Sequence, residues 1–146
     1  MKIAVSACLL GCPCRYDHGN CYSPSIARLA SDHILIPVCP ETMGGLESPR
    51  VPCEIVDGKV INRDGEELTE KIKNGAALAL EAAKEENCQA VICKQYSPSC
   101  GCGKIYDGSF SGTIVRGDGI FTRMLKENGI PVISNDDFES RFEQET

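Results

Sequence analysis

Short apolar runs that alternate with helical stretches are the feature that most constrains the fold of this chain. Four such runs, rich in β-branched residues, are typical of buried strands: Ile3–Val5, Ile34–Val38, Ala90–Cys93 and Ile130–Ile133. Helices are predicted between and after these runs, from the spacing of apolar residues and from helix stop signals, at Ser25–Ser31, Glu66–Glu86, Ile120–Asn128 and from about Asp136. Strands alternating with helices predict parallel βαβ units, so we expect an α/β fold with an open, mostly parallel sheet and helices on both faces.

Two further stretches depart from this alternation. Asp57-Gly58, between the apolar flanks Glu54–Val56 and Lys59–Ile61, is a strong hairpin signal and predicts a β-hairpin near residues 54–61. Lys94–Gly119 is rich in glycine and predicts a long irregular loop, of the kind that usually carries function. A chain of 146 residues fits one ordinary domain, so we expect a single domain over residues 1–146.

The charge balance narrows the classes of partner. Fifteen Lys and Arg residues stand against 21 Asp and Glu residues, and the net charge of −6 repels a polyanion. Bulk nucleic-acid binding is therefore disfavoured. Met1-Lys2 leads directly into Ile3–Val5, an apolar run too short for a secretory signal or a membrane span. We expect a cytoplasmic protein whose partner is a small molecule rather than a membrane.

Ten cysteines are the unusual part of the composition. Thiols stay reduced in the cytoplasm, so a cysteine-rich chain there points to metal or redox chemistry rather than to disulfides. Cys8, Cys39 and Cys100 each follow a predicted strand. Ligands of open α/β sheets bind outside the carboxyl ends of the strands. These three cysteines are therefore expected to converge on one edge of the sheet.

Several motifs carry a resemblance to a known family. They are Ser6–Gly11, Arg15–Asp17, Pro37–Glu41, Gly44–Leu46, Pro49–Arg50, Ser97–Gly101 and Ile105–Gly108. Together they resemble the thiouracil desulfurase family, in order, over Ile3–Ser134. The resemblance implies an open α/β domain in which Cys8, Cys39 and Cys100 bind a 4Fe-4S cluster and leave one iron free to take sulfur from a thiolated nucleobase.

The chemistry of such a site agrees with its residue types. Thiolates are soft ligands, and three of them leave a 4Fe-4S cluster with an open iron that can act as a Lewis acid on a thiocarbonyl group. Glu41 directly follows Cys39-Pro40 and is the first candidate for proton transfer during attack by water. Ser99 is the second candidate, because its hydroxyl can donate a hydrogen bond to substrate or water, although it could equally cap the loop.

The substrate side of the predicted site is carried by four residues: Arg15, Tyr16, Asp17 and Arg50. Hydrogen bonds and stacking from them could orient a base, and the alternative interpretation is a surface ion pair beside a packed tyrosine. The loop also carries His18, where the family pattern has glycine. A histidine there could act as a ligand or a proton carrier, although solvation is the commoner role.

The other cysteines leave alternatives open. Cys12, Cys14, Cys21 and Cys102 either approach the cluster, bind zinc or are loop thiols. A packing role is expected for Cys53, Cys88 and Cys93. The leading function is thus a desulfidase acting on a thiolated small molecule such as a thiopyrimidine. The alternatives are a non-enzymatic metal or cluster carrier and a thiol redox sensor.

Overall fold

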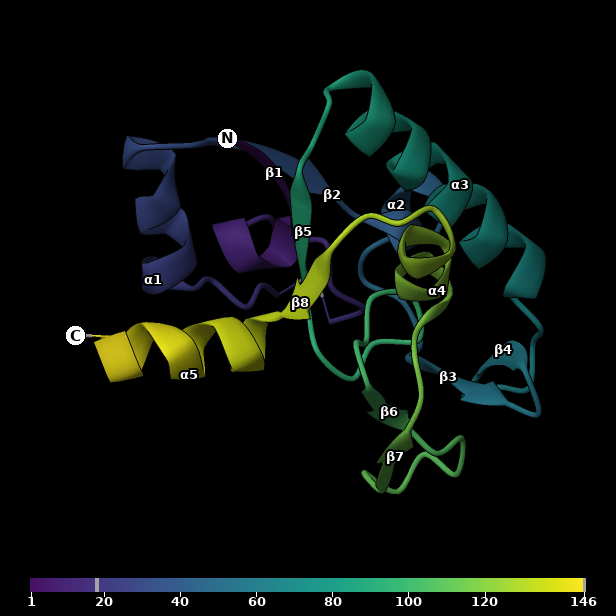
Figure 1. Ribbon diagram of the computed structural model, residues 1–146. Helices are drawn as coiled ribbons and strands as arrows, with labels where there is room; N and C mark the ends of the chain where they lie inside the picture. Colours follow the sequence, from purple (N-terminus) through teal and green to yellow (C-terminus); the bar gives the residue numbers. More distant parts are fainter. Residues whose placement is uncertain (18, 146) are drawn as a thin grey trace.

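A four-stranded parallel sheet forms the centre of the computed structural model, which describes residues 1–17 and 19–145 (Figure 1). The strands are β1 (Lys2–Ser6), β2 (Ile34–Val38), β5 (Ala90–Cys93) and β8 (Val132–Ser134), in the order β2-β1-β5-β8. All three neighbouring pairs are parallel, which confirms the predicted sheet. His18, the loop histidine, lies outside the described residues.

One face of the sheet packs on α3 (Thr69–Glu85) and α4 (Ile120–Glu127). Ala4 and Val91 point to this face and share a buried cluster with Ile72 of α3 and Phe121 of α4. The short helix α2 (Pro40–Met43) joins the same layer and packs on α3. This layer holds most of the buried apolar side chains, and its two longer helices, α3 and α4, are drawn in teal and yellow-green (Figure 1).

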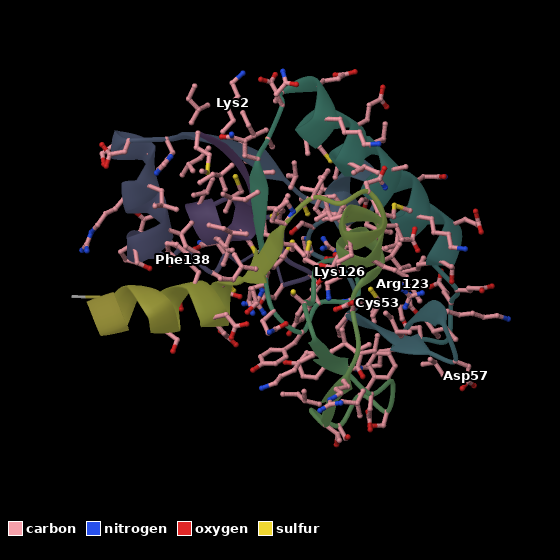
Figure 2. All side chains as sticks on the ribbon, viewed as in Figure 1. Lys2, Cys53, Asp57, Arg123, Lys126 and Phe138 are labelled. Atoms are coloured by element: carbon pink, nitrogen blue, oxygen red, sulfur yellow. The ribbon has the colours of Figure 1, made fainter. Side chains whose placement is uncertain are left out.

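The other face is covered by the remaining helices. They are two 3₁₀ turns, η1 (Ala7–Leu10) and η2 (Arg28–Ser31), and two α-helices, α1 (Pro24–Ala27) and α5 (Asn135–Glu145). Ile3 and Val5 alternate with Ala4 and pack on this side with Ile26 of α1, and Phe138 points from α5 toward the sheet (Figure 2). Helices therefore cover both faces, as predicted.

Two hairpins lie outside the central sheet. β3 (Cys53–Val56) pairs with β4 (Lys59–Asn62), and positive φ angles at Asp57 and Gly58 close the predicted turn. The second hairpin, β6 (Lys104–Tyr106) with β7 (Ile114–Arg116), lies in the stretch for which the sequence predicts only a loop, so that prediction is wrong there. Its strands are three residues long and β7 is exposed, so no alternating pattern marks them.

The contact between α2 and α3 depends on two glycines. A Cβ atom at Gly75 would lie 1.7 Å from the carbonyl oxygen of Pro40, and one at Gly44 would lie 2.1 Å from that of Lys71. No side chain fits at either position, so the two helix backbones meet directly. Glycine inside a helix ordinarily only weakens it, whereas Gly75 allows α2 to pack directly against α3.

No helix among residues 1–17 and 19–145 has the length and apolar character needed to cross a membrane.

Candidate functional site

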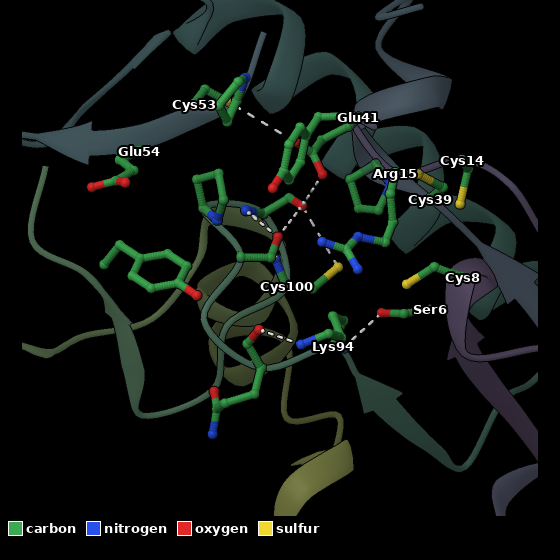
Figure 3. Close-up of a pocket in the computed structure, with 18 of the residues that line it drawn as sticks. Ser6, Cys8, Cys14, Arg15, Cys39, Glu41, Cys53, Glu54, Lys94 and Cys100 are labelled. Carbon is green, nitrogen blue, oxygen red and sulfur yellow. Dashed lines mark hydrogen bonds between the residues drawn. The ribbon is translucent and has the colours of Figure 1, made fainter. Parts of the chain in front are cut away.

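A cavity of about 330 Å³ opens at the carboxyl ends of three strands of the central sheet. Ser6 and Val38, the last residues of β1 and β2, line it, and Lys94 follows β5. Cys8, Cys39 and Cys100 also line the cavity, so the three cysteines do converge there (Figure 3). The βαβ topology brings them together, because each leaves the same edge of the sheet.

Cys8 and Cys39 owe their positions to the strands that precede them. Cys8 lies in η1, two residues after the end of β1, and is buried. Cys39 directly follows β2 and precedes Pro40, which begins α2. Because α2 is fixed against α3, Cys39 is held between a sheet strand and a packed helix.

Cys100 is held instead by hydrogen bonds between its loop and the N-terminal turn of α4. The backbone N–H of Phe121 donates to the carbonyl oxygen of Ser99 at 2.8 Å, and Thr122 Oγ1 donates to that of Cys100 at 2.9 Å. A Cβ atom at Gly119 would lie 2.4 Å from the carbonyl carbon of Ser99. Cys100 is 4% exposed and Ser99 is 1% exposed, so this part of the site is built into the core.

Ser97 stabilises the Ser97–Cys100 loop through hydrogen bonds of its side chain. Its hydroxyl accepts hydrogen bonds from the backbone N–H groups of Ser99 and Cys100, both at 3.1 Å. It also lies 2.8 Å from Ser99 Oγ. The two hydroxyls and the Cys100 thiol thus form one connected polar group against the cavity, since Ser99 Oγ also reaches Cys100 Sγ at 3.7 Å.

Glu41 is the centre of a second connected group. Its Oε2 atom accepts a hydrogen bond from Ser99 Oγ at 3.4 Å and lies 3.5 Å from Arg50 Nη2. Its Oε1 atom accepts a hydrogen bond from Cys53 Sγ at 3.6 Å (Figure 3). Three different segments therefore orient one carboxylate at the wall of the cavity. Arg50 and Glu41 are 10% and 18% exposed, so their attraction is only partly screened by water.

Three of the thiols at the cavity, those of Cys14, Cys39 and Cys100, have a raised pKa. A hydrogen bond with Cys14, together with burial, raises the pKa of Cys39 far above that of a free thiol. A hydrogen bond with Cys93, together with burial, raises the pKa of Cys100. In Cys14 a hydrogen bond with Cys39 lowers the pKa, but a hydrogen bond with Cys8 and burial outweigh it and raise it to about 11. Metal binding therefore has to release these protons.

The donors at the cavity suit an iron-sulfur cluster. Cys8, Cys39 and Cys100 are soft donors that reach the cavity from three separate segments. Among the described residues, no three Cys, His, Asp or Glu side chains are close enough together to hold a single ion. A 4Fe-4S cluster instead takes its thiolates on separate irons. The residues present therefore fit such a cluster.

The four predicted substrate residues fall into two groups. Arg15 and Tyr16 line the cavity, and the Arg15 guanidinium lies 5.4 Å from the centre of the Tyr16 ring. Asp17 and Arg50 do not line it. Asp17 instead pairs with Arg15 at 3.7 Å, and Arg50 pairs with Glu41.

Some residues of the site are missed by the sequence analysis. Tyr106 and Phe110 line the cavity from the second hairpin and its connection, which the sequence predicts as a loop. Cys53 packs in the core as expected, but it also lines the cavity and donates to Glu41. No sequence signal distinguishes it from Cys88 and Cys93, which pack in the core cluster as predicted.

The four loop thiols differ in whether they line the cavity. Cys14 lines the cavity, whereas Cys12, Cys21 and Cys102 are not among its lining residues. Cys21 accepts a hydrogen bond from Arg15 Nη1 at 3.1 Å. Every cysteine is a free thiol.

Comparison with known proteins places this geometry in a family. A model of the 2-thiouracil desulfurase family matches residues 3–137. The chain belongs to the 2-thiouracil desulfurase family. It is 41% identical to the uncharacterized protein YbbK of Bacillus subtilis, over 92% of this chain and 96% of YbbK.

A solved structure of similar fold is that of the [4Fe-4S]-dependent thiouracil desulfidase TudS. The two superpose with a TM-score of 0.89 and share 38% identity, over 95% of this chain and 93% of TudS. The match confirms the α/β fold, and the family membership confirms the resemblance that the motifs carry.

Proposed function

We propose that this chain is a 4Fe-4S-dependent desulfidase that removes sulfur from a thiolated pyrimidine such as 2-thiouracil. The observation that carries the proposal is one cavity with two sets of groups. Cys8, Cys39 and Cys100 form the set for the cluster, and Glu41 with Ser99 forms the set for proton transfer. Family membership and the likeness to TudS support the same chemistry.

Cys8, Cys39 and Cys100 are the proposed ligands. When bound, the cluster supplies an iron that acts as a Lewis acid toward the sulfur of a thiocarbonyl group. The protein residues then have to bring water to the ring carbon and manage its protons. The overall change is balanced without electron transfer: one water oxygen replaces the sulfur on carbon, and the sulfur leaves with two hydrogens as hydrogen sulfide.

Glu41 is the proposed proton acceptor. Its carboxylate faces the cavity and is held in place by Arg50, Cys53 and Ser99, so it can take a proton from a water at the ring carbon. The same carboxyl group can return that proton to the departing sulfur. Ser99 positions the acid, since its hydroxyl donates to Glu41 and lies beside Ser97.

The walls of the cavity suit a small flat ring. Tyr16, Tyr106 and Phe110 are aromatic, and rings of this kind stack on a heterocycle. Arg15 adds a cation with donors for the carbonyl oxygen or the ring nitrogens. A volume of about 330 Å³ is near the lower end of ligand sites, which are about 300–1,000 Å³.

The groups around Glu41 favour an enzyme over a cluster carrier. A carrier needs ligands and access, but it does not need a carboxylate fixed by three partners beside the ligands. We further propose that the chain acts as one domain in the cytoplasm, where its free thiols stay reduced.

Anaerobic reconstitution with iron and sulfide tests the cofactor first. We expect a brown protein with about four irons per chain. Sulfide release from 2-thiouracil by the same sample tests the activity. A loaded protein that releases no sulfide would indicate a carrier, and a colourless protein with stoichiometric zinc would reject the cluster. A protein that binds neither metal but forms a reversible disulfide would indicate a redox sensor.

A further inference from the structure

The connection between β6 and β7, residues 107–113, forms part of the cavity wall although it lies outside the central sheet. Phe110 and Gly112 line the cavity from this connection. Most of the connection is exposed to solvent, and only Gly108 and Phe110 are partly buried. These two residues are therefore the ones that contact the body of the protein.

Glu54 of β3 binds the backbone of both residues. Its Oε1 atom accepts hydrogen bonds from the backbone N–H groups of Gly108, at 3.0 Å, and Phe110, at 3.2 Å. Glu54 is 9% exposed and itself lines the cavity. Among the residues that the structure describes, no other hydrogen bond joins residues 107–113 to the chain outside the β6–β7 hairpin. One buried carboxylate thus ties the connection to β3.

The backbone geometry of the connection agrees with a fixed conformation. A Cβ atom at Gly108 would lie 2.7 Å from the carbonyl oxygen of Ile55, so the connection meets β3 without a side chain between them. Phe110 has a φ of 58°, which a bulky residue adopts only where its surroundings enforce it. The bond to Glu54 supplies such an enforcement and presents the Phe110 side chain to the cavity.

Glu54 lies across the cavity from Cys8 and Cys39 (Figure 3). A thiopyrimidine whose sulfur points toward these cysteines has the opposite ring position directed at the side formed by Glu54 and Phe110. In 2-thiouracil that position is C5, which carries only hydrogen. We propose that Phe110, positioned by Glu54, limits the size of the substituent at this ring carbon. The inference rests on the proposed function and adds a specificity determinant to it.

Phe110→Ala tests the limit on size. The second-order rate constant kcat/KM is measured for sulfide release from 2-thiouracil and from 5-propyl-2-thiouracil. We expect the wild type to prefer 2-thiouracil by at least about tenfold, because the propyl group collides with the Phe110 ring. Phe110→Ala should reduce the preference to about threefold or less. Val115→Ala is the matched control, since Val115 is an apolar residue of the same hairpin that does not line the cavity, and it should keep the wild-type preference.

Glu54→Ala and Glu54→Gln test the positioning role. Glu54→Ala frees the connection and should relax the preference as Phe110→Ala does. Glu54→Gln should retain the preference, because its amide oxygen can accept the same two hydrogen bonds. Each preference is a ratio within one protein, so a general loss of activity or of cluster does not change it.

Hydrogen exchange followed by NMR tests the anchor in the metal-free protein, without any reaction. The amide hydrogens of Gly108 and Phe110 should exchange at least about tenfold faster in Glu54→Ala than in the wild type. Lys59→Ala is the control, because Lys59 is an exposed residue of the β3–β4 hairpin, and its rates at both amides should equal those of the wild type.

Equal use of both substrates by the wild type, or an unchanged preference in Phe110→Ala, would overturn the inference and leave the proposed function intact. Unchanged exchange in Glu54→Ala would overturn the role of Glu54. An iron-loaded wild type that releases no sulfide from 2-thiouracil would reject the proposed function, and the inference with it. If circular dichroism shows that Glu54→Ala does not fold, Phe110→Ala decides, since it leaves the anchor in place.

Discussion

The two loops that bring thiols to the cavity are built in different ways. Ser97–Cys100 is tied to the N-terminal turn of α4 by backbone and side-chain hydrogen bonds, and Ser99 and Cys100 are buried. Gly11–Ser23 bonds mainly to itself and to η1, and Tyr16 within it is 40% exposed. The first loop thus offers fixed geometry, and the second offers side chains that can adapt to a ligand.

The two loops also hold their cysteines in different ways. Cys100 cannot leave its place without breaking the contact between its carbonyl oxygen and Thr122. The backbone beside Cys14 is instead held by Ser48, whose Oγ atom lies within hydrogen-bond distance of the carbonyl oxygens of Pro13 and Arg15.

Cys100→Ser changes the buried loop, Ser97–Cys100, and has the largest expected effect. Removal of one of three soft ligands should abolish cluster retention and with it all sulfide release. Iron content after anaerobic desalting measures the loss. Cys88→Ser is the matched control, since Cys88 packs against the core away from the cavity and its change should alter thermal stability only mildly. Full iron retention by Cys100→Ser would contradict the ligand assignment.

Glu41→Gln should keep the cluster and lose turnover. The amide retains the size and polarity of the side chain but cannot accept the proton from water, and general acid-base catalysis is worth about a hundredfold to ten-thousandfold. Sulfide release from 2-thiouracil is measured on samples of known iron content, so that chemistry is separated from cluster loss. Near-normal turnover by a fully loaded variant would remove Glu41 from the mechanism.

The sequence predicts more of the part of the site near the sheet and the Ser97–Cys100 loop than of the part formed by the Gly11–Ser23 loop. Apolar runs such as Ile34–Val38 and Ala90–Cys93 coincide with strands, and the rule for carboxyl ends then places Cys39 and Cys100 at one edge. These features depend on local patterns and on topology, both of which a single sequence carries.

The environment of Glu41 could not be predicted in this way. Its partners Arg50, Cys53 and Ser99 come from three segments, and the contact between α2 and α3 that positions it depends on Gly44 and Gly75. Such contacts follow from packing in three dimensions, which no periodicity encodes. For the same reason the sequence leaves Arg50 open between a substrate contact and an ion pair, and only the structure identifies Glu41 as its partner, at 3.5 Å.

Ser99→Ala tests whether the core loop positions the acid or takes part in proton transfer. One hydrogen bond to a carboxylate is worth roughly 1.5 to 3 kcal/mol, which corresponds to a loss of turnover of about ten- to 150-fold. Steady-state kinetics on iron-matched samples measures this, and the cluster content should not change. A loss as large as that of Glu41→Gln would show that the hydroxyl itself carries a proton.

Tyr16→Ala tests the outer loop and should have the smallest effect. Tyr16 lines the cavity but is 40% exposed, and its contact with the Arg15 guanidinium at 5.4 Å is a cation–π pair worth about 0.5–1 kcal/mol at an exposed site. Loss of the ring should therefore raise the KM for 2-thiouracil a few-fold and leave kcat and iron content unchanged. Tyr16→Phe keeps the ring and should keep the KM.

Tyr22→Ala is the control on the same loop, because Tyr22 is 54% exposed and does not line the cavity. A fall in kcat without a change in KM would instead place Tyr16 among the groups that orient the reacting atoms, and the division of labour between the two loops would then be wrong.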